Sequence, residues 1–391
     1  MTNNQVPALN REHTEAATPG RGRKVRYVTG LEQLAESLPP EQRERLSAVS
    51  ERYAFRANDY YLRLIDWSDP HDPIRQLVIP RVEELAPGGH LDASNEQRYT
   101  VARGVQHKYS DTVLFLCNEV CGAFCRYCFR KRLFMNGNDE VSLDITAGLA
   151  YVAAHPEVTN VLLTGGDPLM LSTRRLQRII ASLWEIPHVR IVRIGSKMPA
   201  FNPFRISDDE ELLDSLEHYG RGHLTFYLMA HFDHPRELTP AAAEALRRLQ
   251  SVGVQMVNQC PLVRGVNDDV ATLQELFRRL SHLGCPQYYL FQGRPTAGNV
   301  PYQLPLVRAA RLFKEACAGV SGLARRARLV MSHETGKIEI VAVDEHRIYL
   351  RYHRAARPAD QGRFMVCRRD DQALWLDELV PEALEAEAEA A

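Results

Sequence analysis

Residues 113–130 have the sequence VLFLCNEVCGAFCRYCFR, in which an apolar run leads directly into a group of cysteines. The apolar residues 113–116 predict a buried β-strand, so the cysteines fall in the loop that follows it. Three of them, Cys121, Cys125 and Cys128, have the spacing Cys-x3-Cys-x2-Cys. One short loop can therefore offer three thiolates to a single metal centre.

A four-iron, four-sulfur (4Fe-4S) cluster suits this spacing, because its irons take cysteine thiolates as ligands. Three protein ligands leave one iron open for another molecule. The alternatives are a chance grouping or a zinc site, but zinc sites usually join a Cys-x2-Cys pair to a second Cys or His pair, and none stands out. Cys117 lies at the strand end, where a buried and inert thiol is the usual interpretation, and its contact with the cluster is left open.

The composition is ordinary for a soluble globular protein: 391 residues, 45% hydrophobic and 25% charged, with a formal net charge of −1. A nearly neutral chain argues against general nucleic-acid binding, which needs a basic surface. No apolar run approaches the roughly 18 residues of a membrane span, and the N-terminus has no hydrophobic signal core. The remaining cysteines are scattered, which suits a reducing compartment. We therefore expect a cytoplasmic protein that binds neither nucleic acid nor membranes.

Strand and helix patterns alternate six times along the centre of the chain. The expected strands are 113–116, 158–164, 189–194, 224–229, 254–258 and 287–291, and the expected helices are 145–155, 174–185, 208–219, 240–253 and 270–284. Short loops between such units predict an α/β fold of parallel strands with helices outside. The sheet is expected to close fully or partly into a (β/α)6-type barrel.

The flanking regions have a different texture. Residues 1–25 are polar and expected to be disordered, and residues 26–100 predict a helical segment followed by a connector rich in Pro, Asp and Gly. The barrel is expected over residues 101–322. Residues 323–369 predict a small C-terminal β segment, with alternating strand patterns at 328–341 and 348–352, and residues 370–391 an acidic tail.

In barrels of parallel strands, chemistry collects at the C-terminal ends of the strands. The unusual loops follow those ends: the cysteines, Gly165-Gly166-Asp167-Pro168, Gly195-Ser196-Lys197, His231, Asn258-Gln259 and Gln292. The paired glycines would let the backbone approach a ligand closely, although a plain tight turn is the default. His231 and His234 have metal-like spacing, but without a third ligand a structural role is favoured. The convergence of these loops predicts an active site at the end of the barrel where the strands terminate.

The cysteine spacing resembles that of the radical S-adenosylmethionine (SAM) superfamily, in which the amino and carboxyl groups of SAM chelate the open iron. The Gly165-Gly166-Asp167 turn resembles the superfamily motif that holds the methionyl amino group. The resemblance therefore implies a 4Fe-4S cluster on the three cysteines and SAM beside it.

Residues 106–352 more closely resemble the lysine 2,3-aminomutase family. The matching pieces, in consistent order, are 107–109, the cysteine loop with 130–132, the Gly-Gly-Asp turn, 186–196, 231–235, 258–259, 264–268, 288–289 and 336–337. The matched segments imply cofactor contacts from Ser196, His231 and Gln259.

The family binds pyridoxal phosphate (PLP) as a Schiff base to a lysine after a glycine, which falls on Lys337 here. A deprotonated, buried amine suits that task. Lys108 and Tyr109 lie where the family contacts the PLP phosphate or ring. Arg130 takes the position of the substrate-carboxylate arginine, whose fork can grip a carboxylate through two hydrogen bonds.

The implied reaction moves an amino group from Cα to Cβ of an amino acid by radical chemistry. The implied partners are a small amino-acid substrate and a reducing electron donor such as flavodoxin or ferredoxin, while assembly into a homo-oligomer is left open. The rivals are a PLP-independent hydrogen abstraction on another substrate and a non-catalytic iron–sulfur sensor.

The chain departs from the lysine-specific pattern at the substrate end. Lysine-specific members read the distal ammonium with two aspartates, but here Arg294 takes one position and residues 329–332 contain no acid at the other. An arginine cannot hold an ammonium, and a missing counter-charge in a dry pocket is costly. We therefore expect that lysine is not the main substrate and that Arg294 binds a second carboxylate or a polar group. The family's glycine-rich run before the lysine is replaced by Ser332-His333-Glu334-Thr335.

Overall fold

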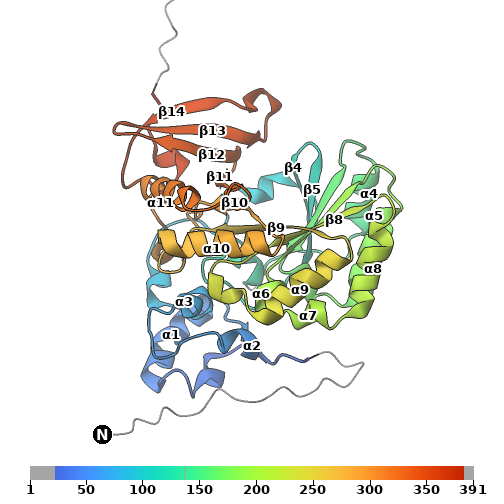
Figure 1. Ribbon diagram of the computed structural model, residues 1–391, viewed down its shortest axis with the longest axis horizontal. Helices are drawn as coiled ribbons and strands as arrows, with labels where there is room; N and C mark the ends of the chain where they lie inside the picture. The colour runs from blue at the N-terminus through green and yellow to red at the C-terminus, as the bar shows by residue number, and fades with distance from the viewer. Residues whose placement is uncertain (1–22, 136, 383–391) are drawn as a thin grey trace, which may run out of the picture.

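The computed structural model describes residues 23–135 and 137–382 (Figure 1), and one twelve-stranded sheet dominates it. Seven neighbouring strands run parallel in chain order: β5 (Thr112–Asn118), β6 (Asn160–Gly165), β7 (Ile191–Ser196), β8 (Thr225–Ala230), β9 (Gln255–Pro261), β10 (Gln287–Phe291) and β11 (Arg328–His333). Antiparallel strands extend both edges: β4 (Val105–Tyr109) and β3 (Thr100–Ala102) beside β5, and β12 (Gly336–Val343), β13 (Arg347–Ala355) and β14 (Phe364–Arg368) beside β11.

Helices connect the parallel strands and cover the outer face of the sheet (Figure 1). They are α4 (Thr146–Ala153), α5 (Thr173–Trp184), α8 (Glu210–Gly220), α9 (Pro240–Ser251), α10 (Val270–His282) and α11 (Leu306–Ala318), with the short α6 (Met198–Phe201) and α7 (Phe204–Ser207) after β7. Several begin where a side chain caps the first turn, since Asp209, Thr239 and Asp269 each accept a backbone hydrogen bond from three residues ahead. Their apolar stripes face the core.

The α/β fold and its alternating units are confirmed, and the expected elements agree with the observed bounds within a few residues. Three features were not predicted. The pattern at 328–341 holds two strands, β11 and β12, and β11 is parallel to the barrel strands. Helix α11 and the β3–β4 hairpin were also missed.

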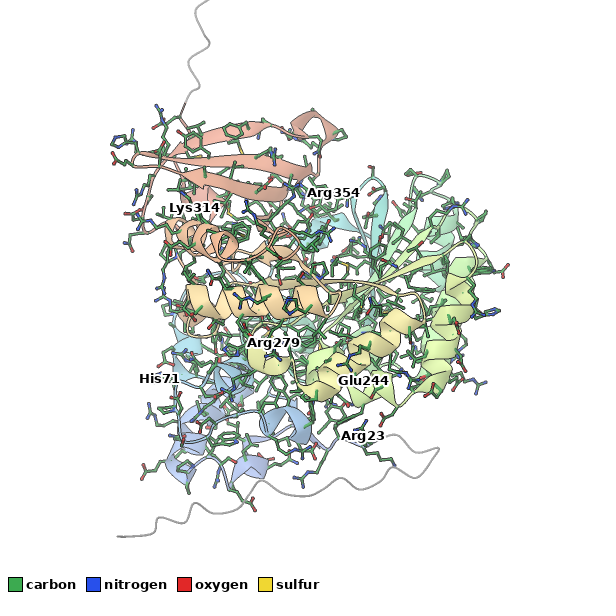
Figure 2. The ribbon with its side chains drawn as sticks, viewed as in Figure 1. Arg23, His71, Glu244, Arg279, Lys314 and Arg354 are labelled. Carbon is green, nitrogen blue, oxygen red and sulfur yellow. The ribbon has the colours of Figure 1, made fainter. Side chains whose placement is uncertain are left out.

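The barrel is partial, because no backbone ladder among the described residues joins β3 to β14. Side chains bridge the gap instead. Lys108 on β4 donates to the His333 carbonyl of β11, and Tyr99 donates to the Glu334 carbonyl over 2.7 Å. Arg354 on β13, which is labelled in Figure 2, pairs with Asp111 before β5. These contacts tie residues just before β5 to the C-terminal end of β11 and to β13.

The N-terminal segment packs beneath the barrel as drawn in Figure 1. It contains α1 (Pro40–Arg52), α2 (Asp59–Leu62), α3 (Pro73–Val78) and the small sheet of β1 (Tyr27–Val28) and β2 (Ala57–Asn58). It holds the cysteine loop: Phe124 N–H donates to Arg56 O, and Arg126 N–H to Leu77 O, both over 2.9 Å. The Arg126 guanidinium also forms a buried ion pair with Glu84, at 2.7 Å.

One apolar core runs from Val28 to Leu379 through the four expected parts of the chain after residue 25, so the boundaries at 101, 323 and 370 stay predictions. Residues 370–382, where the acidic tail was expected to begin, pack against the C-terminal strands. The reason is their apolar content, because Ala373, Trp375 and Leu379 are buried. The expected disorder of 1–22 and the end of the acidic tail, 383–391, lie outside the described residues.

Every helix among residues 23–135 and 137–382 is too short or too polar to cross a membrane.

Candidate active site

A cavity of about 330 Å³ opens among the C-terminal ends of the parallel strands. Every site residue predicted from the sequence lines it: Cys121, Cys125, Cys128, Lys108, Tyr109, Arg130, Gly165, Gly166, Asp167, Ser196, His231, Gln259, Arg294 and Lys337. Cys117 does not. Its buried thiol points at the Thr164 carbonyl over 3.6 Å, and burial raises its pKa to about 12, as an inert thiol requires.

The cysteine loop presents its three thiols to one side of this cavity. Arg56 Nε donates to the Cys121 carbonyl over 2.9 Å and Asn58 donates to the Gly122 carbonyl over 3.1 Å, which fixes the start of the loop. Burial raises the pKa of all three thiols, that of Cys125 to about 12. A thiolate in this place needs a cationic partner, which iron would provide.

The Gly-Gly-Asp turn after β6 packs tightly on the cysteine loop. Gly166 N–H donates to Asn118 O over 2.5 Å and Asp167 N–H to Val120 O over 2.9 Å. A Cβ on Gly166 would lie 2.5 Å from the Val120 oxygen, and Gly165 has φ of 105°. The glycines thus allow the close approach of two backbone segments, and both also line the cavity, so their approach to a ligand stays a prediction.

Asp167 is held by protein donors. Its carboxylate accepts hydrogen bonds from Ser196 Oγ over 2.9 Å, Lys197 N–H over 2.8 Å and Leu169 N–H over 3.0 Å. Burial raises its pKa to about 6 in spite of these bonds. Asp167 therefore ties the loop after β6 to the loop after β7, beside the cysteines.

Replacing Gly166 by alanine is expected to destabilise the protein by about 1–3 kcal/mol, because the new methyl group overlaps the Val120 backbone. The iron content after reconstitution should fall with it, since the cysteine loop must move. Gly195→Ala is the matched control, because its Cβ would meet nothing closer than 3.5 Å. Urea unfolding and iron assay measure both effects, and equal stability of the two variants would contradict this account.

A buried charge network extends from the cavity wall at His231. His231 Nε2 lies 3.1 Å from both Asp233 Oδ1 and the Tyr127 hydroxyl, and Tyr127 also donates to Asp233. Lys197 bridges Asp233, at 2.5 Å, and Glu237, at 2.7 Å. Burial opposes the charge on Lys197, but the two carboxylates outweigh it and raise its pKa. Asp233 lies in the matched segment 231–235 but was not predicted as a site residue, and Glu237 lies outside the matched segments.

The pair His231 and His234 does not share a ligand position. His234 Nδ1 accepts from the Arg236 N–H over 3.2 Å, whereas His231 faces Asp233 and Tyr127. This agrees with the structural interpretation of that spacing. Gln292 is likewise structural, since its amide donates to the Leu304 and Leu374 carbonyls.

Lys337 begins β12 and reaches the side of the cavity formed by aromatic residues. Its Nζ lies 4.9 Å from the centre of the Tyr289 ring and 4.8 Å from that of Phe291. Burial, then the charges of Arg294, Lys108, Arg193 and Arg354, hold the pKa of Lys337 well below its usual range. No carboxylate among the described residues forms an ion pair with it, which favours the uncharged, nucleophilic form of its amine.

Three cations lie near this lysine. Lys108 donates to the His333 carbonyl, and burial, followed by repulsion from Arg294, lowers its pKa to about 7. Arg354 lies over the Tyr109 ring at 4.3 Å, and Arg193 donates to Asn160 over 2.9 Å. Arg193 and Arg354 were not predicted as site residues, since no role is implied for Arg193 within the matched segment 186–196 and Arg354 lies outside the matched residues.

Arg130 and Arg294 meet at a carboxylate that the sequence did not reveal. Arg130 binds Glu96 through Nε at 3.0 Å and Nη2 at 3.2 Å, and Arg294 binds it at 3.2 Å. Arg294 also stacks on Phe129 at 3.7 Å. Glu96 lies in the connector, which showed no readable pattern.

Comparison with known proteins identifies the family. The family model of the radical SAM superfamily matches residues 116–303, and such a domain implies a 4Fe-4S cluster and SAM. A protein of Aquifex aeolicus named "Putative L-lysine 2,3-aminomutase" is 53% identical over 358 residues, 91% of this chain and 96% of the relative. The L-lysine 2,3-aminomutase of Clostridium subterminale is 35% identical over 75% of this chain and 71% of its own length. The glutamate 2,3-aminomutase of Clostridioides difficile is 30% identical over 76% and 70%.

The similarity to the Aquifex relative extends beyond the barrel, because the match covers 91% of this chain. The family predicted from the sequence is therefore confirmed. The chain belongs to the lysine 2,3-aminomutase family of radical SAM enzymes, which are isomerases acting on small molecules.

Proposed function

We propose that this protein is a PLP-dependent amino-acid 2,3-aminomutase that moves an amino group from Cα to Cβ, and that its substrate is not lysine. The observation that carries the proposal is a single cavity lined both by three cysteines and by Lys337, whose pKa is held well below its usual range by burial and nearby cations. A hydrogen-abstracting centre and a carbonyl cofactor could thus act on one small molecule.

The residues around Lys337 fit PLP. Its neutral amine suits attachment to an aldehyde, and Tyr109, Tyr289 and Phe291 offer flat surfaces beside it. The PLP phosphate would be bound by the positively charged side chains of Lys108, Arg193 and Arg354. When bound, PLP supplies a carbon that can carry the migrating nitrogen and a ring that delocalises an unpaired electron.

The cysteines and the residues beside them fit the cluster and SAM. Cys121, Cys125 and Cys128 would hold three irons, and the Gly-Gly-Asp turn with Ser196 and Gln259 lines the adjoining space. When bound, these groups supply a radical that can take hydrogen from an unactivated carbon. The protein's own share is to fix the cysteine loop, hold the substrate carboxylate with Arg130 and exclude water. Delivery of the electron by a protein such as flavodoxin or ferredoxin stays a prediction.

The charges of the cavity disfavour lysine. Glu96 and Asp167 are the acidic side chains lining it within the described residues, and both are engaged by protein donors. A distal ammonium would lie near Arg294 with no free counter-charge, which is costly in a buried site.

Anaerobic reconstitution with iron, sulfide, SAM and PLP, followed by a panel of amino acids, tests the proposal. We expect a β-amino product from at least one uncharged or acidic amino acid and much slower turnover of lysine. Comparable turnover of lysine would refute the substrate claim. Borohydride should fix PLP to Lys337 and leave Lys314, exposed on α11 (Figure 2), unlabelled. SAM cleavage without labelled Lys337 would instead favour PLP-independent chemistry.

Cys125→Ala is expected to abolish the cluster, because a loop with two thiolates cannot hold it in place. Cys117→Ala is the matched control, since Cys117 is buried away from the cavity. Iron and sulfide content and the visible absorption of the reconstituted proteins provide the measurement. Retention of the same iron centre by Cys125→Ala, or its loss in Cys117→Ala, would reassign the ligands.

A further inference from the structure

The Glu96 carboxylate is the meeting point of three guanidinium groups at the cavity wall. Arg130 approaches with Nε and Nη2 at 3.0 and 3.2 Å, Arg132 with Nη2 at 3.1 Å and Arg294 with Nη1 at 3.2 Å. Burial opposes its ionisation, but the arginines outweigh burial and hold its pKa far below the usual value. Glu96 is thus a permanent anion in the substrate cavity.

Arg132 is neutralised separately. Glu140 contacts it at 2.8 and 3.0 Å, and Asp92 lies 3.6 Å away. Neither Glu140 nor Asp92 lines the cavity. Arg130 and Arg294 are therefore left to share one carboxylate, so that within this group of side chains two guanidinium charges face one carboxylate charge inside the cavity.

The donors of Arg130 agree with this charge count. A guanidinium has five N–H groups. Two of those on Arg130 point to Glu96, and a third donates to Thr164 Oγ1 over 3.0 Å. One N–H on each terminal nitrogen is left, which is enough for one carboxylate. A single α-carboxylate would use both the charge and the free donors.

We propose that Glu96 sets the specificity of the site, so that the enzyme accepts amino acids with one carboxylate and an uncharged side chain. This inference rests on the proposed aminomutase function and narrows its substrate. A second carboxylate would bring an unpaired negative charge into the cavity, because Glu96 already uses Arg294. A distal ammonium would face Arg130 and Arg294 instead. Arg294 then contributes a stacked, polar surface over Phe129.

Pairs of amino acids with similar shape and different charge test the inference: glutamine and glutamate, asparagine and aspartate, norleucine and lysine. Binding is measured at equilibrium from the change in PLP absorbance in the cofactor-loaded protein, without turnover. In each pair that binds, the uncharged member should bind at least about tenfold more tightly. Tighter binding of a charged member in any pair overturns the inference, whatever the variants show.

Glu96→Gln should improve the binding of glutamate relative to glutamine by about tenfold, because it frees a positive charge for the second carboxylate. Glu140→Gln is the matched control, since Glu140 touches Arg132 outside the cavity, and it should leave the ratio unchanged. An unchanged ratio in Glu96→Gln overturns the role of Glu96. If that variant does not fold, the wild-type pairs still decide.

The two proposals fail differently. If β-amino products form from any amino acid, the aminomutase function stands and the paired comparison judges Glu96 alone. If no amino acid in the panel shifts the PLP absorbance or yields a β-amino product, the proposed function fails, and this inference fails with it.

Discussion

Replacing Lys337 by methionine is expected to abolish aminomutase turnover without lowering the thermal stability of the protein. Removal of a covalent catalytic group costs roughly 10³-fold or more in rate. Methionine has similar length and no amine to desolvate, and Lys337 has no ion pair to lose among the described residues. The melting temperature at neutral pH should therefore stay equal or rise.

The same variant tests the direction of the Lys337 pKa shift. The unfolded chain keeps the proton on this amine up to its usual pKa of 10.5, whereas the folded protein releases it at much lower pH. The unfolded state thus binds more protons in this interval, so the free energy of unfolding of the wild type should rise with pH relative to the variant. Lys314→Met, at an exposed site, is the control and should change neither the rate nor this slope. A drop in melting temperature on Lys337→Met would show that the amine is charged and paired.

Lys197→Met is expected to reduce the free energy of unfolding by about 3–5 kcal/mol at neutral pH, because it leaves two buried carboxylates without their shared cation. The Lys197 side chain is 5% exposed, and those of Asp233 and Glu237 are 0% exposed. Cluster binding should weaken too, since Tyr127 of the cysteine loop is anchored on Asp233.

The loss should shrink in acid, because protonation removes the uncompensated charge on Asp233 and Glu237 in the variant. In the wild type, the charge of Lys197 helps to hold the pKa of Asp233 below its usual value. Mild acid therefore does not protonate Asp233 and does not raise the free energy of unfolding of the wild type. Urea unfolding at neutral pH and at about pH 5 compares the two. Arg221→Met provides the control, because its exposed pair with Glu217 contributes at most about 1 kcal/mol. An equal loss of unfolding free energy in Lys197→Met and Arg221→Met would show that the buried network does not stabilise the fold.

The sequence predicted the candidate site well because the site follows a topological rule. Loops after parallel strands gather at one edge of a sheet, so locating the strand before Cys121 and the strand before Gly165 also located their meeting point. Lys337 needed the family resemblance, since spacing alone did not distinguish it from a lysine on a strand edge.

The missed features depend on contacts between distant residues. Glu96 acquires its role from Arg130 and Arg294, which are 34 and 198 residues away, and no local periodicity marks it. The partners of Asp167 could not be inferred either, because a carboxylate in a turn is equally suited to a ligand amine and to backbone N–H groups. The part that Lys108 plays in closing the barrel, through the His333 carbonyl, could not be inferred for the same reason.

The cysteine loop follows β5 and Lys337 begins β12, and both strands belong to one hydrogen-bonded sheet (Figure 1). The spacing between the cysteine loop and Lys337 is therefore set by strand register, and no hinge between separate domains can alter it. Loops on the helical side could lengthen or shorten during evolution while this spacing stayed constant. A protein built in this way can change in loop length and still keep its cysteine loop at the same reach from Lys337.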